Sequence, residues 1–336
     1  MSKDVRQLSF ATWLRVASML LILLCHYCAA CDVPAVTMLS QIFNIGVQLF
    51  FILSGFLVGY KGISRPYTKW YLKRVKRIFV PYWLFLAALV GVHVAKGLDI
   101  FTTDWLLLVL GCQGSVVGVL GAEQTWFISV LLLCYLLSPA ILWTNKKLLQ
   151  LNNKGITIGA YGIVCALPIL YAVAEPDWVY TLLTPVSLYA IACVYGGYYR
   201  KNNGYTRSPK LLLWSFAVIA AAFSLRFASR ALIDGTIWYT RIIVPYTHMV
   251  AAAAIWLSFE TVFQTDCAPP KAIQFAGDLS FEIYLWHYMF VVGPVSIFAM
   301  VNNWAAACIA TTMVVFALSF VSRKITTFLS TNPLKK

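Results

Sequence analysis

Two ionisable side chains, Arg15 and His26, interrupt an otherwise apolar stretch that reads LRVASMLLILLCH. Such groups are costly within a membrane-length segment unless they are paired or face a polar cavity, so they indicate a functional site. On an α-helix their spacing leaves them only about 20° apart around the axis and roughly 16 Å apart along it. We therefore expect both to line one face of one helix. Taken singly, each also fits a structural role, Arg15 as an interfacial residue and His26 as a hydrogen-bonded packing residue.

A second polar cluster is the basic run KRVKRIFVPYW, in which Arg74 and Arg77 are three residues apart and so share one helix face. Beside a membrane, these arginines could bind anionic lipid headgroups. They could equally hold the phosphates of a nucleotide-like cofactor, because a guanidinium offers bidentate donors. The residues alone leave both alternatives open.

Three further stretches of the sequence place polar side chains in apolar surroundings. Glu123 and Trp126 open an apolar run, where they suit an interfacial helix start, although the carboxylate could instead orient or deprotonate a histidine. Tyr284 and His287 recur at helical spacing and make one face of their segment polar. Ser54, in the SGF turn of another apolar run, could pack closely or donate a hydrogen bond.

Composition defines the elements that must position these groups. The chain has 336 residues, of which 61% are hydrophobic and 11% charged. A soluble domain is about 25% charged, so this composition excludes a soluble globule and predicts an all-α, polytopic transmembrane helix bundle. The net charge of +14 lies mostly in a few short basic loops, as the positive-inside rule predicts, and does not indicate a nucleic-acid partner.

Apolar segments of near-spanning length recur along the whole chain. They cover residues 10–31, 41–60, 78–95, 105–120, 126–143, 156–174, 181–199, 211–228, 242–262, 280–300 and 305–321. The basic loops 61–77 and 144–155 can share the cytoplasmic side only if the glycine-rich segment 105–120 does not cross. We therefore predict about ten spans, with 105–120 as a re-entrant or interfacial segment and both termini cytoplasmic.

The same pattern predicts a single integral-membrane domain over residues 1–336, with a core at 8–322. The loop with Glu175 and Asp177, which lacks basic residues, is expected outside.

The cysteines give no strong sign of a metal site. Cys25, Cys28 and Cys31 form a CxxCxxC run beside His26, and such spacing can serve a metal or an iron–sulfur cluster. The run lies at the end of an apolar helix and lacks a proline or a fourth ligand. We therefore expect no metal, and interpret most of the other cysteines as small hydrophobic residues.

Taken together, these clusters resemble the membrane-bound acyltransferase 3 family. Arg15 and His26 look like its R-x10-H motif, residues 46–57 (GVQLFFILSGFL) are similar to its second-span motif, and Arg74-Val-Lys-Arg77 is similar to its R-x-x-R motif. Residues 280–287 (SFEIYLWH) resemble its last block. The run from Glu123 matches more loosely.

The resemblance implies transfer of an acyl group, often acetyl, from cytoplasmic acyl-CoA to a hydroxyl of a surface carbohydrate or lipid-linked sugar, in the cell membrane. In this hypothesis His26 is the general base, since an imidazole exchanges a proton near neutral pH. Arg15 positions the thioester or stabilises the developing oxyanion, with Glu123 as a possible catalytic partner. Arg74 and Arg77 grip the acyl-CoA phosphates.

We expect Ser54, Trp126, Tyr284 and His287 to contact the acceptor substrate, and membrane lipids to surround the protein. A different class of protein also remains open. A transporter or flippase of a glycan-lipid or small anion would use the same Arg15 and His26 as substrate or proton sites.

Overall fold

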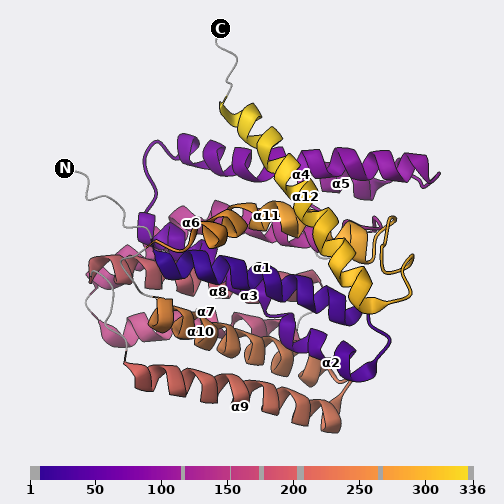
Figure 1. The fold of residues 1–336 in the computed structure, drawn as a ribbon. Coiled ribbons are helices and arrows are strands. Elements are labelled where there is room, and N and C mark those ends of the chain that lie inside the picture. Colours follow the sequence, from indigo (N-terminus) through magenta and orange to yellow (C-terminus); the bar gives the residue numbers. More distant parts are fainter. Residues whose placement is uncertain are drawn as a thin grey trace. The chain divides into compact units, whose positions relative to one another are not determined.

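The computed structural model describes residues 8–114, 118–151, 153–173, 178–202, 208–263 and 268–331, and within these ranges it contains helices but no strand. The predicted all-α class is thus confirmed. The elements in chain order are α1 (Ser9–Ala29), α2 (Pro34–Phe43), α3 (Gly46–Lys61), α4 (Tyr67–Ala95), α5 (Thr103–Leu110), the 3-10 turn η1 (Glu123–Thr125), α6 (Trp126–Gln150), α7 (Lys154–Val173), α8 (Trp178–Lys201), α9 (Pro209–Ile233), the π-helix η2 (Tyr239–Ile243), α10 (Val244–Phe263), α11 (Lys271–Val291) and α12 (Trp304–Thr331) (Figure 1).

Seven helical segments within the described ranges are long and apolar enough to cross a membrane. They are Ser9–Ala29, Pro34–Lys61, Tyr67–Ala95, Glu123–Leu148, Pro209–Ile233, Tyr239–Phe263 and Trp304–Leu329. The multi-pass character of the chain is therefore confirmed. The predicted number of spans and the cytoplasmic position of the termini stay predictions. Glu175 and Asp177, used to place one loop outside, lie beyond the described residues.

The glycine-rich segment 105–120 forms only one short helix in its described part. α5 has 8 residues and ends at Leu110, and the next residue, Gly111, has a left-handed φ of 69°. Its length of about 12 Å is far below the roughly 30 Å of a bilayer core. The helix is thus too short to cross, and a re-entrant course for the segment stays a prediction.

Two predicted boundaries were wrong. The segment 280–300 is instead α11, which begins at Lys271 and ends at Val291, just before Gly293 and Pro294. Hydropathy misplaced the start because Lys271, Gln274 and Asp278 lower the apolar signal without disfavouring the helix. At the other end, Pro294 restricts the backbone before it and cannot continue the helical hydrogen bonds.

The second error concerns the basic loop 61–77. Its second half is helical, because α4 already begins at Tyr67, directly after Pro66. Lys and Arg are good helix formers, so a basic run extends a span beyond its apolar part. Arg74 and Arg77 are therefore positioned by a regular helix.

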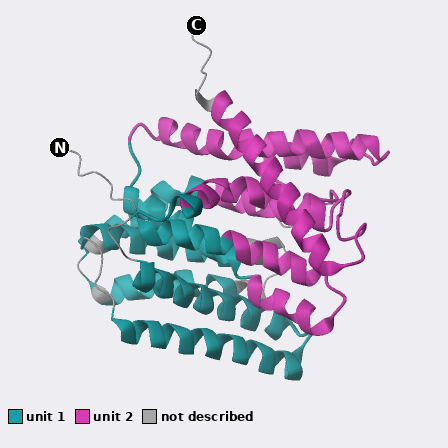
Figure 2. Cartoon of the chain, viewed as in Figure 1, with its two compact units in different colours: residues 1–18, 45–64, 133–273 teal, residues 19–44, 65–132, 274–336 magenta. Residues whose placement is uncertain are grey.

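The chain divides into two compact units (Figure 2). The first contains residues 1–18, 45–64 and 133–273, and the second contains 19–44, 65–132 and 274–336. α1, α6 and α11 each contribute residues to both units. The prediction of a single membrane domain is a separate question and stays a prediction.

Glycines bring two helices of the first unit into backbone contact. A Cβ added at Gly55 or Gly59 of α3 would overlap a carbonyl of α8, at Tyr189 and Cys193 respectively. On α8, a Cβ at Gly196 would overlap the carbonyl of Phe56. Small residues spaced four apart are the usual means of close helix approach in membranes. The glycines around the SGF turn thus serve packing.

The second unit is built around α4, α11 and α12. Phe85 of α4 packs edge-on against Trp286 of α11, with ring centroids 5.6 Å apart. The Tyr82 hydroxyl of α4 donates a hydrogen bond of 2.8 Å to the carbonyl of Leu108 in α5. α11 and its neighbours in this unit carry most of the residues that could do chemistry.

Candidate active site

Two histidines of the second unit face each other. His26, near the end of α1, and His287, near the end of α11, have ring centroids 5.1 Å apart. The ring of Tyr288 packs perpendicular to that of His26 at 4.9 Å. His287 is fully buried, with 0% exposure, whereas His26 is partly exposed. Of the two, His26 is therefore the histidine with an exposed part of its side chain.

The hydrogen bonds of His287 define its proton arrangement. Its Nδ1 lies 2.7 Å from the backbone carbonyl of Tyr284, which can only accept. In a neutral imidazole, a protonated Nδ1 leaves Nε2 as an acceptor. This Nε2 is buried and has no hydrogen-bond partner among the described residues. A buried acceptor without a hydrogen bond costs free energy. Such an acceptor is typical of a site where a ligand, or a side chain that moves, supplies the missing donor.

The turn that precedes α6 is tied to α11 by two hydrogen bonds. The Gln124 side chain donates from Nε2 to the carbonyl of Leu285 at 2.8 Å. In return, the Tyr284 hydroxyl donates to the carbonyl of Gln124. The Tyr284 ring also packs edge-on against Phe127, with centroids 5.1 Å apart. Tyr284 is therefore a residue that anchors η1 and the start of α6 to the helix that carries His287.

Glu123 is engaged by its own turn. Its Oε2 accepts a 2.7 Å hydrogen bond from the backbone N–H of Gly121. Its charge acts electrostatically with His93 and with Tyr288, which packs on His26. Among the described residues, no hydrogen bond joins Glu123 to His26 or His287. Glu123 was predicted to orient or deprotonate a histidine. In the described residues it is linked to His26 indirectly, through Tyr288, which packs on the His26 ring.

A basic cavity of about 550 Å³ opens between α4, α11 and α12. Its charged lining residues are Lys73, Lys76, Arg77, Arg323 and the single carboxylate Glu282. Four cations against one anion favour a ligand with several negative charges. Within unit 2, α11 thus lines this cavity at Glu282 and the histidine site at His287, about 7.5 Å further along its axis.

The two arginines predicted to act together are separated. Arg77 lines the basic cavity, whereas the Arg74 guanidinium carbon lies 4.7 Å from the ring centroid of Trp70, in a cation–π arrangement. Arg74 does not line the cavity. Of the two arginines of the motif, Arg77 is thus the one that lines the basic cavity.

The remaining predicted residues are distributed between the units. Arg15 shares the continuous helix α1 with His26, as expected, but belongs to the first unit, and Ser54 of α3 also lies there. Trp126 begins α6 in the second unit and is half-buried. For Arg15 and Ser54, the predicted roles in the site stay predictions.

Sequence reasoning missed several polar residues. Gln124 is buried at 4% exposure, yet only its neighbour Glu123 was singled out. Glu282 is 1% exposed and pairs with Arg323 at 3.4 Å. In the first unit, the buried Glu260 accepts hydrogen bonds from the Tyr195 hydroxyl and the Trp256 indole. Acidic and amide residues within apolar helices are the signal that could have found all three.

No group of three or more His, Cys, Asp or Glu residues in the described ranges could hold a metal ion. Cys25, Cys28 and Cys31 are free thiols.

These features define a multi-pass helical membrane protein with a histidine pair and a basic cavity carried by one helix of the same unit. A family model described as an acyltransferase domain, that of the acyltransferase 3 family, matches residues 8–323, nearly the whole chain. The chain therefore belongs to the acyltransferase 3 family. No curated protein and no solved structure matches it in the comparisons made.

Proposed function

We propose that this protein is an acyl-CoA-dependent O-acyltransferase of the cell membrane. It transfers an acyl group, expected to be acetyl, from cytoplasmic acyl-CoA to a hydroxyl of a surface carbohydrate or lipid-linked sugar. Membership in the acyltransferase 3 family supports the reaction class. The observation that carries the assignment of the site is the partly exposed His26 beside the buried, unpartnered Nε2 of His287.

In the proposed reaction, His26 removes the proton from the acceptor hydroxyl as its oxygen attacks the thioester carbonyl carbon. A carbon–oxygen bond forms, the carbon–sulfur bond breaks, and the thiolate of coenzyme A leaves. The proton held by His26 then passes to that thiolate, so the enzyme returns to its starting state. Arg15, roughly 16 Å from His26 along α1, is proposed to position the thioester-bearing arm of the donor.

His287 is proposed to orient His26. Because its Nδ1 donates to the Tyr284 carbonyl, its Nε2 can accept a hydrogen bond from one ring nitrogen of His26. The other nitrogen of His26 then carries the lone pair that takes the proton. In this arrangement His287 is a positioning residue, and Tyr284 holds it through the backbone. Trp126, at the beginning of α6 in the same unit, is proposed to contact the acceptor.

The donor is proposed to enter through the basic cavity. Its four cations suit the phosphates of coenzyme A, and α11 runs from Glu282 in that cavity to His287 at the reacting centre. The competing function is transport of a glycan-lipid or small anion with the same ionisable residues.

Deleting the gene tests the proposed reaction. Mass spectrometry of surface glycans and lipids is expected to show that one component loses an acyl mass, and that the wild-type gene restores it. Purified protein is expected to make the same product only when acyl-CoA is supplied. Unchanged surface components, together with counter-flow of a glycan-lipid in proteoliposomes without acyl-CoA, would support the transporter instead.

The two arginines of the basic run are expected to respond differently to substitution. Arg77→Gln should raise the KM for acyl-CoA by roughly 10-fold or more, because a charge-assisted hydrogen bond to phosphate contributes about 1.5–3 kcal/mol. Arg74→Gln should change it less, since that guanidinium lies on Trp70. Steady-state kinetics with acyl-CoA varied would measure both. Equal effects at the two positions would contradict the separation seen here.

A further inference from the structure

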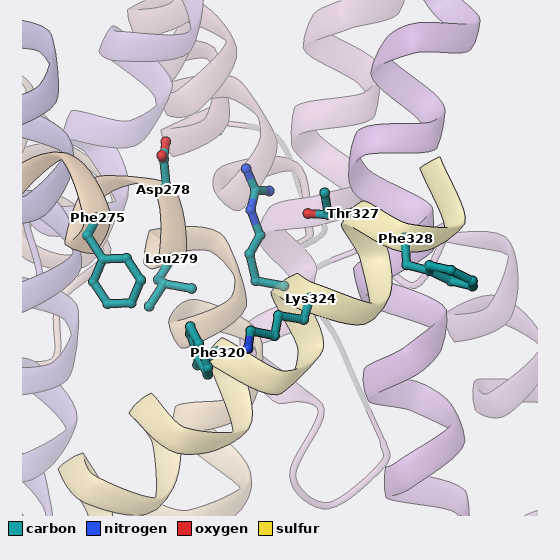
Figure 3. A pocket seen from close by; sticks show the side chains of 8 residues that line it. Phe275, Asp278, Leu279, Phe320, Lys324, Thr327 and Phe328 are labelled. Atoms are coloured by element: carbon teal, nitrogen blue, oxygen red, sulfur yellow. The ribbon is translucent and has the colours of Figure 1, made fainter. Parts of the chain in front are cut away.

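A second cavity adjoins the basic one. It has a volume of about 440 Å³ and lies between the first half of α11 and the last third of α12 (Figure 3). Arg323 and Thr327 line both cavities. A ligand with two chemically different parts could therefore occupy the two cavities at once, with Arg323 at the junction.

The second cavity has the chemistry of a site for a planar base. Phe275 of α11 and Phe320 of α12 are 50% and 39% exposed, and their ring centroids are 6.0 Å apart. The Lys324 ammonium lies 4.5 Å from the Phe320 ring centroid (Figure 3). Aromatic side chains can stack on any nucleobase, because every base has a π-face. The Asp278 carboxylate, also on α11, could accept a hydrogen bond from an exocyclic amino group.

Arg323 is held at the junction by a buried carboxylate. Its guanidinium lies 3.4 Å from Oε1 of Glu282, whose side chain is only 2% exposed. The other oxygen of Glu282, Oε2, is buried with no hydrogen-bond partner among the described residues. Since a guanidinium has five N–H donors, the ion pair orients Arg323 and leaves donors for a phosphate.

We propose that the cavity between α11 and α12 binds the nucleoside end of the acyl donor. The adenine stacks on Phe275 and Phe320, and its amino group donates to Asp278. The phosphates lie at Arg323 and continue into the basic cavity beside Arg77. This inference rests on the proposed function, because it specifies how acyl-CoA is recognised. An anionic lipid headgroup would satisfy the basic cavity but has no planar base for the aromatic one.

The position of the cavity along α11 agrees with this assignment. From Phe275 to His287 the helix axis rises by about 18 Å. Glu282, beside the proposed phosphate position, is about 7.5 Å from His287 along the same axis, a separation that the flexible pantetheine arm can cover in a bent form. A donor with its adenine at the beginning of α11 would therefore bring its thioester to the histidine pair near the end of the same helix.

Binding measurements on the purified full-length protein test the proposal without requiring turnover. The probes are coenzyme A, adenosine 3′,5′-bisphosphate and 4′-phosphopantetheine, titrated calorimetrically. Phe320→Ala and Asp278→Ala are each expected to weaken the first two, Phe320→Ala by about 5- to 150-fold, the range for loss of one base–aromatic stack. Both variants should bind 4′-phosphopantetheine as the wild type does. Met313→Ala, at a 69% exposed position of α12 outside both cavities, is the matched control.

The outcomes separate this inference from the proposed function. If the wild type binds coenzyme A and neither Phe320→Ala nor Asp278→Ala weakens that binding, the nucleoside site alone is overturned. Displacement of coenzyme A by phosphatidylglycerol vesicles but not by adenosine 3′,5′-bisphosphate would reassign the cavity to lipid. If the wild type bound no coenzyme A, the proposed donor itself would be wrong.

Discussion

Replacing His26 with alanine is expected to lower the kcat of acyl transfer by about 10²- to 10⁴-fold, the usual contribution of a general base. The physical reason is that no other partly exposed imidazole lies in the histidine pair, because His287 is fully buried. The protein should still insert and purify normally, since His26 makes ring contacts but no side-chain hydrogen bond among the described residues. Product formation under saturating acyl-CoA measures the effect.

Leu24→Ala is the matched control for this substitution. Leu24 lies on the same helix, two residues before His26, and is 42% exposed. Its variant should retain activity and should elute in gel filtration like the His26 variant. Full activity in His26→Ala would remove the general base from the proposed mechanism. An unchanged coenzyme A affinity in that variant would locate the defect in the chemical step.

Gly59→Leu is expected to destabilise the first unit by about 3 kcal/mol or more, at the upper end of the cost of overpacking. A side chain at this position meets the backbone carbonyl of Cys193, and a helix backbone cannot move aside as a flexible side chain can. Thermal unfolding followed by fluorescence-detected gel filtration should show a lower melting temperature and less monodisperse protein.

Gly91→Leu provides the comparison, because an added Cβ at Gly91 of α4 has no neighbour within 4 Å. Leucine is also a better helix former than glycine. That variant should be as stable as the wild type. Equal stability of the two leucine variants would contradict the close approach of α3 and α8.

The sequence was sufficient for the features that depend on helix periodicity and burial. Arg15 and His26 could be placed on one helix because the spacing between them alone defines a shared face. His287 was found for the same reason, since its segment shows a polar face at helical spacing. These predictions need no knowledge of which helices are neighbours.

Features that depend on helix neighbours could not be predicted. The pairing of His26 with His287 joins residues far apart in the chain, and Glu282 becomes interpretable only beside Arg323. Likewise, the spacing of Arg74 and Arg77 indicates that they share one helix face. It does not indicate that Arg74 packs on the ring of Trp70. Gln124 was passed over because a charged neighbour gives a stronger signal than a buried amide.

The unbroken course of α11 has a consequence for how such a protein can vary. Insertion of one residue between Asp278 and His287 would turn everything beyond it by about 100° and shift it by about 1.5 Å. The buried histidine would then leave its partner, and compensating changes would be needed on several other helices. Insertions and deletions should therefore be disfavoured within the helix, and tolerated only beyond Ile297, whose backbone N–H still bonds back to Phe290 of α11. The spacing from Asp278 to His287 along α11 is accordingly expected to stay constant among related chains.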